Sequence, residues 1–260
     1  MESGMFRRAI VRPPAANFAE GLTTVDLGRP DVEKALAEHA AYCRALVECG
    51  LELTRLPADP RFPDSTFVED AALITPGGAV LTRPGAPSRA GEVDGIAEAL
   101  APFFPAPRRI EAPGTLDGGD ICEAGDHWFI GISERTNPEG ARQLARFLAD
   151  DGVSSSTVDI RGVAGILHLK SGIAWLSGRR LVVIDSLAAN PAFAAWDRIR
   201  VEPSEVYAAN AVVVNDAVLF ARGFPHLEGR LVELGYRPLV LDMSEFQKMD
   251  GGLSCLSLRF

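Results

Sequence analysis

The sequence lacks several features that would each point to a particular class of protein. It has no apolar run of membrane-spanning length, and Met1–Phe18 contains no continuous apolar stretch of the kind found in secretory signals. It also contains neither G-x-x-x-x-G-K nor G-x-G-x-x-G, so nothing supports a nucleotide cofactor. The four cysteines include no C-x-x-C and the four histidines show no metal-ligand spacing. We therefore expect a cytoplasmic protein with reduced cysteines, no metal and no organic cofactor.

Basic residues are too few for a general nucleic-acid or membrane-surface protein. Lysine and arginine number 26 against 35 acidic residues, which gives a net charge of -9. This balance argues against nucleic-acid and membrane partners and leaves room for a small cationic ligand. The length of 260 residues and the 47% hydrophobic content suit one globular domain over 1–260. A homo-oligomer is compatible with the sequence.

The chain contains an approximate internal repeat of strand, strand, helix and strand. Five copies are expected, and the fifth combines 251–260 at the C-terminus with 6–57 at the N-terminus. The expected opening strands are 67–75, 118–124, 166–176, 210–216 and 251–260. The expected helices are 88–104, 139–150, a short piece around Phe193, 226–235 and 31–50. This order predicts an α/β fold in which five ββαβ units close a ring with pseudo-fivefold symmetry. An open two-layer α/β sandwich is the alternative.

The helix expected over 31–50 has capping residues at both ends. Asp31 is a typical N-cap, and Gly50 is a typical residue for the left-handed position after the last turn. The apolar positions fall on one predicted face, which we expect to be buried: Leu36, Ala40, Cys43, Leu46 and Val47.

A polar or reactive side chain falls at a matching place in each expected opening strand. These residues are Glu69 with Asp70, Asp117 with Asp120, His168, Asn210 and Cys255. Taken singly, each has an ordinary structural explanation, such as a turn aspartate, a strand histidine or an inert buried thiol. In a ring, however, matched positions converge on the axis. The repeat therefore predicts one central pocket that contains a thiol, an imidazole and several carboxylates.

This set of groups suits nucleophilic catalysis on a cation. A cysteine nucleophile needs a proton acceptor and an acid for the leaving group, and one histidine can serve as both. A carboxylate behind the histidine fixes its tautomer. Further carboxylates would repel an oxyanion but would bind a planar guanidinium bidentately. Because like charges disfavour a second anion, we expect the resting thiol of Cys255 to be largely neutral.

The chain resembles the dimethylarginine dimethylaminohydrolase family of the guanidino-modifying superfamily. The similar stretches span nearly the whole chain in order: 12–23, 61–74, 81–92, 112–121, 129–137, 167–172, 207–210 and 245–260. The resemblance implies the five-bladed propeller called a pentein, with Cys255 as nucleophile, His168 as acid and base, and Asp117 orienting His168. Many relatives have glutamate at the place of Asp117. The implied reaction converts methylated arginine to citrulline and methylamine or dimethylamine.

The resemblance also implies the residues that bind the substrate. Asp70 grips the guanidinium with support from Glu69, and Leu22 lies on a lid over the pocket. The amino-acid end is held by Asp64, Arg89 and Arg135.

Two alternative functions stay open at this point. An arginine deiminase-like hydrolase belongs to the same superfamily, but such enzymes typically have a second carboxylate two residues after the histidine, where this chain has Lys170. The propeller also serves as a non-catalytic, ribosome-binding initiation factor. The Cys, His and carboxylate set and the acidic charge both argue against that function.

Overall fold

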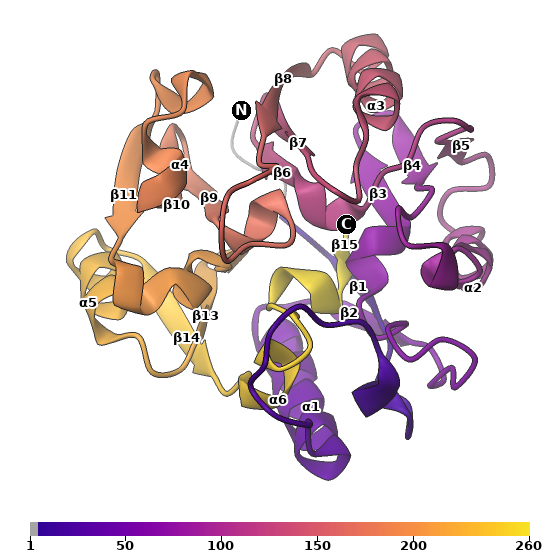
Figure 1. Cartoon of the computed structure of the whole chain (residues 1–260), viewed down its shortest axis with the longest axis horizontal. Coiled ribbons are helices and arrows are strands. Elements are labelled where there is room, and N and C mark those ends of the chain that lie inside the picture. The colour runs from indigo at the N-terminus through magenta and orange to yellow at the C-terminus, as the bar shows by residue number, and fades with distance from the viewer. Residues whose placement is uncertain (1–4) are drawn as a thin grey trace.

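The computed structural model describes residues 5–260, so the first four residues of the predicted domain lie outside the described part. Five small sheets surround a central axis, which confirms the closed ring and excludes the open sandwich (Figure 1). Each sheet has three strands, of which the middle one pairs antiparallel with one neighbour and parallel with the other. Parallel neighbours require a crossover, and here a helix on the outside of the ring provides it.

All five predicted copies are present. The first comprises β3 (Ala72–Thr75), β4 (Gly78–Leu81), α2 (Glu92–Leu100) and β5 (Arg108–Arg109), and the second β6 (Ile121–Ala124), β7 (His127–Ile132), α3 (Pro138–Asp150) and β8 (Ser154–Asp159). The third comprises β9 (Ile173–Ser177), β10 (Arg180–Ile184), α4 (Asp185–Ala188) and β11 (Asp197–Val201). The fourth comprises β12 (Val212–Val214), β13 (Ala217–Ala221), α5 (Pro225–Glu233) and β14 (Arg237–Leu241).

The fifth copy joins the two ends of the chain. It comprises β15 (Leu258–Arg259), β1 (Arg8–Val11), α1 (Val32–Glu48) and β2 (Glu52–Arg55), while α6 (Ser244–Gln247) lies just before it. Strand β15 pairs antiparallel with β1, and this pairing closes the ring. No helix in the described residues 5–260 is long and apolar enough to cross a membrane.

Helix α1 begins and ends as predicted but buries a different face. The Asp31 carboxylate accepts hydrogen bonds from the N–H groups of Glu33 and Lys34, and Gly50 has a φ of 91°. Cys43 and Leu46 are buried, whereas Leu36, Ala40 and Val47 are exposed. The predicted face was therefore wrong in part. The buried face of α1 also includes polar residues, which have hydrogen-bond partners there. The Glu38 carboxylate accepts hydrogen bonds from the Glu245 N–H, and the Tyr42 hydroxyl is hydrogen-bonded to the Ser257 hydroxyl.

The matched polar residues do not lie in strands, which corrects the sequence prediction. Each opening strand is shorter than expected because a 3-10 turn precedes it. These turns are η2 (Val68–Ala71), η4 (Gly118–Asp120), η5 (Leu169–Ser171), η7 (Pro203–Ala209) and η8 (Ser254–Leu256). Neighbouring turns contact one another from η8 through η2, η4 and η5 to η7. Asn210, directly after η7, closes this inner ring through hydrogen bonds with Ser254.

Candidate functional site

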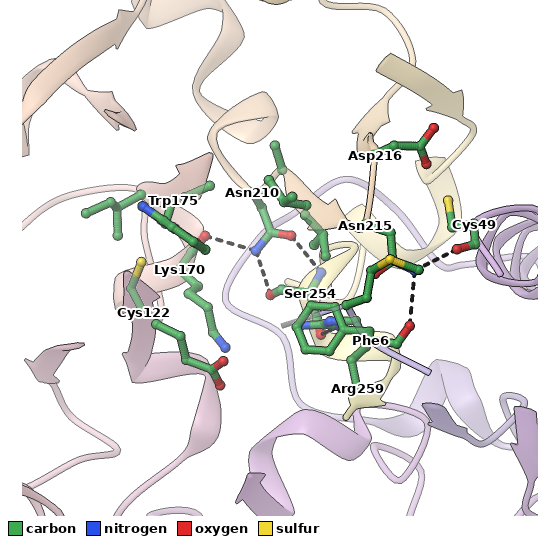
Figure 2. A pocket seen from close by; sticks show the side chains of 17 residues that line it. Phe6, Cys49, Cys122, Lys170, Trp175, Asn210, Asn215, Asp216, Ser254 and Arg259 are labelled. Atoms are coloured by element: carbon green, nitrogen blue, oxygen red, sulfur yellow. Dashed lines mark hydrogen bonds between the residues drawn. The ribbon is translucent and has the colours of Figure 1, made fainter. Parts of the chain in front are cut away.

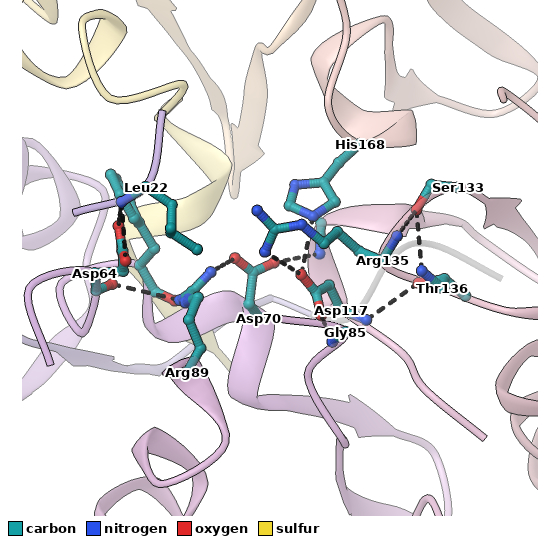
Figure 3. Close-up of polar contacts among 12 residues, drawn as sticks. Leu22, Asp64, Asp70, Gly85, Arg89, Asp117, Ser133, Arg135, Thr136 and His168 are labelled. Atoms are coloured by element: carbon teal, nitrogen blue, oxygen red, sulfur yellow. Dashed lines mark hydrogen bonds and ion pairs between the residues drawn. The ribbon is translucent and has the colours of Figure 1, made fainter. Parts of the chain in front are cut away.

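The turns at the axis surround a cavity that contains Cys255 and His168. The cavity has a larger part of about 230 Å³ and a smaller part of about 20 Å³, and both residues line both parts. Asp64, Asp70, Arg89 and Arg135 line the smaller part (Figure 3). Asn210 lines the larger part, so the structure brings residues from all five repeats to one place.

Cys255 lies in turn η8, where two glycines allow the chain to pass close to its neighbours. A Cβ on Gly251 would lie 2.4 Å from the Phe67 ring, and one on Gly252 would lie 2.5 Å from the Asn210 amide. Only glycine fits such approaches. Burial, Glu69 and Asp70 raise the pKa of the Cys255 thiol to about 12. A neutral resting thiol was expected from the sequence, and the direction of this shift agrees with that expectation.

His168 is buried among carboxylates. Its Nε2 lies 3.1 Å from Oδ2 of Asp117, whose other oxygen accepts a hydrogen bond of 2.8 Å from the Gly85 N–H (Figure 3). Burial alone would lower the pKa of His168, but Asp70, Asp120 and Asp117 outweigh it and raise the pKa to about 9. His168 is therefore an imidazolium at neutral pH, ready to donate a proton.

Asp70 is held rigidly as an anion. Its Oδ1 accepts a hydrogen bond of 2.8 Å from the Gly119 N–H, and its Oδ2 lies 2.5 Å from Nη1 of Arg89. Burial would raise the pKa of Asp70, but His168 and Arg89 outweigh it and lower the pKa to about 2. A carboxylate fixed beside a thiol presents a negative charge to a cationic ligand at any ordinary pH.

The two predicted arginines differ in how far their charges are already paired. Arg89 is buried and contacts both Asp70 and Glu92, with its Nη2 lying 2.8 Å from Glu92. Arg135 is more available, because its side chain is 15% exposed and its nearest carboxylate oxygen, on Asp117, is 3.8 Å away. A ligand carboxylate would therefore meet a freer cation at Arg135 than at Arg89.

Asp64 binds the backbone of the segment that carries Leu22. The Leu22 N–H donates to both oxygens of Asp64, at 3.0 and 3.2 Å, and a Cβ on Gly21 would overlap the same carboxylate. The Leu22 side chain is 42% exposed and lines the smaller part of the cavity. The structure therefore places Leu22 at the mouth of the cavity.

Glu69 does not line either part of this cavity, although the sequence placed it with Asp70. Its Oε1 lies 2.6 Å from Lys170 Nζ and 3.3 Å from Arg259 Nη2. Both cations line a second cavity, of about 430 Å³, together with Asn210 and Ser254 (Figure 2). Lys170 also lines the cavity of Cys255, so the Lys170–Glu69 pair lies between the two cavities.

Met249 and Asp250 were not expected at this site, and Asp120 was expected in the central pocket without a defined role. Met249 and Asp250 line the cavity directly before the two glycines. Asp120 lies beneath His168, where it accepts hydrogen bonds from the Leu169 N–H and from Ser133. The Asp-Gly-Gly order at 250–252 was the available signal for Asp250, since such a tripeptide favours tight turns.

In the described part of the chain, one cluster has the residue types and spacing of a possible metal site. It consists of Asp70, Asp117 and His168, whose ligand atoms lie within 4.8 Å of one another. Both oxygens of Asp70 and both of Asp117 already have protein partners. A protonated His168 has no free lone pair for a metal. The cluster is therefore arranged for charge and proton transfer.

Comparison with known proteins gives full-length relatives. No protein-family model matches the chain. It is similar to the N(G),N(G)-dimethylarginine dimethylaminohydrolase of Pseudomonas aeruginosa, with 47% identity over 98% of this chain and 100% of the relative. The protein of the same name from Streptomyces coelicolor is 35% identical over 97% of this chain and 96% of the relative. A solved structure of the Pseudomonas aeruginosa protein, a cysteine-to-serine mutant complexed with citrulline, has a TM-score of 0.95 at 46% identity and covers 98% of this chain and 100% of that one.

Proposed function

The chain belongs to the dimethylarginine dimethylaminohydrolase family, and we propose that it hydrolyses Nω-methylated arginine to citrulline and methylamine or dimethylamine. The observation that carries this proposal is one buried cavity that holds a thiol, an imidazolium and a fixed carboxylate, at Cys255, His168 and Asp70. Such a site fits a planar cation that is attacked at carbon. The acidic net charge and the size of the cavity support a small cationic substrate in a cytoplasmic enzyme, without nucleic-acid or membrane partners.

Substrate binding uses both ends of the smaller cavity. Asp70 accepts hydrogen bonds from the guanidinium. Glu69 does not contact the substrate, and its negative charge favours binding of the cation. At the amino-acid end, Asp64 faces the ammonium group and Arg135 faces the carboxylate. Arg89 contributes mainly by holding Asp70, because its guanidinium is already paired with two carboxylates. Leu22 covers the bound substrate.

The first chemical step forms a covalent intermediate. The arriving guanidinium brings a positive charge next to Cys255, lowers the pKa of the thiol and lets its proton leave to solvent. The Sγ anion then bonds to the guanidinium carbon. His168 donates its proton to the methylated nitrogen, the C–N bond breaks, and methylamine or dimethylamine departs. An S-alkylthiouronium remains on Cys255.

The second step returns the enzyme to its resting state. His168 is now neutral and takes a proton from a water molecule as the water oxygen bonds to the same carbon. The C–S bond breaks, the departing sulfur takes up the proton left on the new oxygen, and neutral citrulline leaves with the thiol restored. Asp117 keeps Nε2 of His168 aligned through both proton transfers, at the 3.1 Å separation seen here.

Selectivity for methylated substrate rests on Lys170. A carboxylate at this position would add a second clamp for the bare nitrogens of arginine. Lys170 instead pairs with Glu69 at 2.6 Å and leaves Asp70 to bind the guanidinium in the cavity of Cys255. We therefore expect a higher kcat/KM for methylated arginine than for arginine.

The test is citrulline formation from dimethylarginine, monomethylarginine and arginine under the same conditions. Turnover of the methylated substrates with little turnover of arginine is expected. A clear preference for arginine would make the protein an arginine deiminase-like hydrolase, and no citrulline from any of the three would refute the proposal.

A further inference from the structure

The segment from Gly21 to Gly28, here called the lid, covers the cavity of Cys255. These eight residues are all described, and none belongs to a helix or strand. Leu22 lines the smaller part of the cavity, while Val25 and Leu27 line the larger part. All three side chains are also partly exposed, by 37 to 51%. A segment with one face on the cavity and the other in solvent needs specific contacts to stay in place.

Two carboxylates that line the smaller part of the cavity provide these contacts. Asp64 holds the Leu22 N–H from the side of η2. Asp250 holds the next two residues of the lid, because its Oδ2 accepts a hydrogen bond of 2.5 Å from the Thr24 N–H and lies 3.4 Å from Thr23 Oγ1. Thr23 Oγ1 also donates to the carbonyl of Lys248, at 3.0 Å. Hydrogen bonds to a charged acceptor are stronger than neutral ones, so Asp250 supplies the main anchor on its side.

The backbone of Asp250 is held in an unfavourable conformation. Its φ is 56°, in the left-handed region that favours glycine. The chain continues through Gly251 and Gly252 to Cys255, and a Cβ on Gly251 would collide with the Phe67 ring. The same short segment therefore carries the nucleophile and the carboxylate that grips the lid. A strained residue that persists beside a nucleophile suggests a role in function.

We propose that Asp250 is a positioning residue that latches the lid over Cys255. Its carboxylate holds Thr24 while methylated arginine is bound, and release of this bond opens the cavity for exchange of substrate and citrulline. This inference rests on the proposed function for the identity of the substrate. Asp250 itself takes no part in bond making or breaking, so its loss affects access and binding more than chemistry.

Three variants separate the latch from the backbone strain. Asp250→Gly removes the carboxylate and accepts a φ of 56° without strain. Asp250→Asn also tolerates this conformation and keeps an oxygen that can accept from Thr24. The matched control is Asn215→Gly, because Asn215 is the other non-glycine residue of the described chain with a positive φ, at 55°, and lies at the second cavity rather than the lid.

The first readout does not depend on turnover. Iodoacetamide alkylation of Cys255, followed by peptide mass spectrometry without substrate, measures how often the cavity is open. We expect alkylation to be about tenfold faster in Asp250→Gly, as expected for loss of one hydrogen bond to a charged group. Asp250→Asn should retain most of the protection, and Asn215→Gly should match the unmodified protein. The KM for dimethylarginine should rise by about the same factor in Asp250→Gly, with a much smaller change in kcat.

Unchanged alkylation and KM in Asp250→Gly would overturn the latch, as would an equal increase in Asn215→Gly. If Asp250→Gly does not fold, Thr23→Val removes the hydrogen bond to the Lys248 carbonyl and should give a smaller increase in both readouts; no increase there would also count against the latch. If the unmodified protein forms no citrulline, the proposed function fails, but the alkylation comparison still decides whether Asp250 holds the lid.

Discussion

At the scale of single residues, the proposed mechanism places Cys255 and His168 in one covalent cycle. Replacing Cys255 by Ser or His168 by Gly should reduce kcat by several orders of magnitude, because the loss of either partner stops the same sequence of steps. Both variants should fold, since each replacement leaves Asp70, Asp117 and the turn backbones in place. The check is citrulline formation together with a thermal unfolding curve. Folded Cys255→Ser that retains substantial turnover would contradict the mechanism.

The charge of His168 predicts the pH dependence of kcat. The proposed reaction needs His168 with its proton, and the pKa of His168 is raised to about 9. In the substrate complex the bound guanidinium lowers the pKa of the thiol, so rising pH favours its ionisation, whereas the acid is lost above about 9. The rate should therefore rise from neutral pH and fall again beyond about 9.

The partner of His168 can be used to test this assignment. Asp117→Asn removes a carboxylate that raises the pKa of His168, so the descending limb of the profile should move to lower pH. Asp117→Glu keeps the charge and should leave the limb near its original position. A descending limb that does not respond to Asp117→Asn would mean that another group limits the rate at high pH.

At the scale of secondary-structure elements, α1 carries a buried histidine that affects stability. His39 is 4% exposed, its Nδ1 lies 3.7 Å from Cys43 Sγ, and burial followed by Arg55 lowers its pKa to about 4. The unfolded chain has a pKa near 6.5 at this residue and takes up the proton first. The free energy of unfolding should therefore fall as pH drops from about 6.5 to 4, by on the order of 3 kcal/mol.

Urea unfolding across this pH window checks the prediction. His39→Gln should flatten the dependence, whereas His226→Gln, at an exposed position on α5, should leave it unchanged. His168 does not interfere, because its raised pKa makes its contribution fully present below about 6.5 and lost only as pH rises through about 9. An equally steep fall in His39→Gln would assign the effect to another group.

The elements also show what the sequence could and could not predict. The ring and the five polar positions followed from the repeat, and Asp31 caps its helix as expected. The 3-10 turns did not follow, because one turn of three or four residues has too little periodicity to distinguish it from the start of a strand. Ion pairs between side chains of different segments could not be predicted from the sequence either. The contacts of Arg89 with Asp70 and of Glu69 with Lys170 join residues that are far apart in the sequence, and both changed the expected role of a site residue.

At the scale of the whole molecule, stability depends on the closure of the ring by the two chain ends. Leu258 in β15 is 4% exposed and pairs with Ile10 in β1, while the Phe260 carbonyl accepts hydrogen bonds from the N–H groups of Arg7 and Arg8. Leu258→Ala should lower the free energy of unfolding by about 2–4 kcal/mol, as expected for a truncated core leucine.

Val232→Ala provides the control for this change, because Val232 is equally apolar but 57% exposed on α5. Its effect should stay within about 0.5 kcal/mol. Denaturant unfolding of both variants gives the comparison. Equal losses in the two would mean that the closure contributes no more than an exposed surface position does.

In the proposed reaction, Cys255 attacks the guanidinium carbon and carries the intermediate. The most direct test mixes enzyme with dimethylarginine, quenches in acid within the first turnovers, and locates the added mass by peptide mass spectrometry. We predict an adduct on Cys255 with the mass of the substrate less dimethylamine, which disappears as citrulline forms and is absent from Cys255→Ser. Citrulline released at full rate with no adduct on Cys255 at any time, or an adduct on another cysteine that turns over, would contradict it.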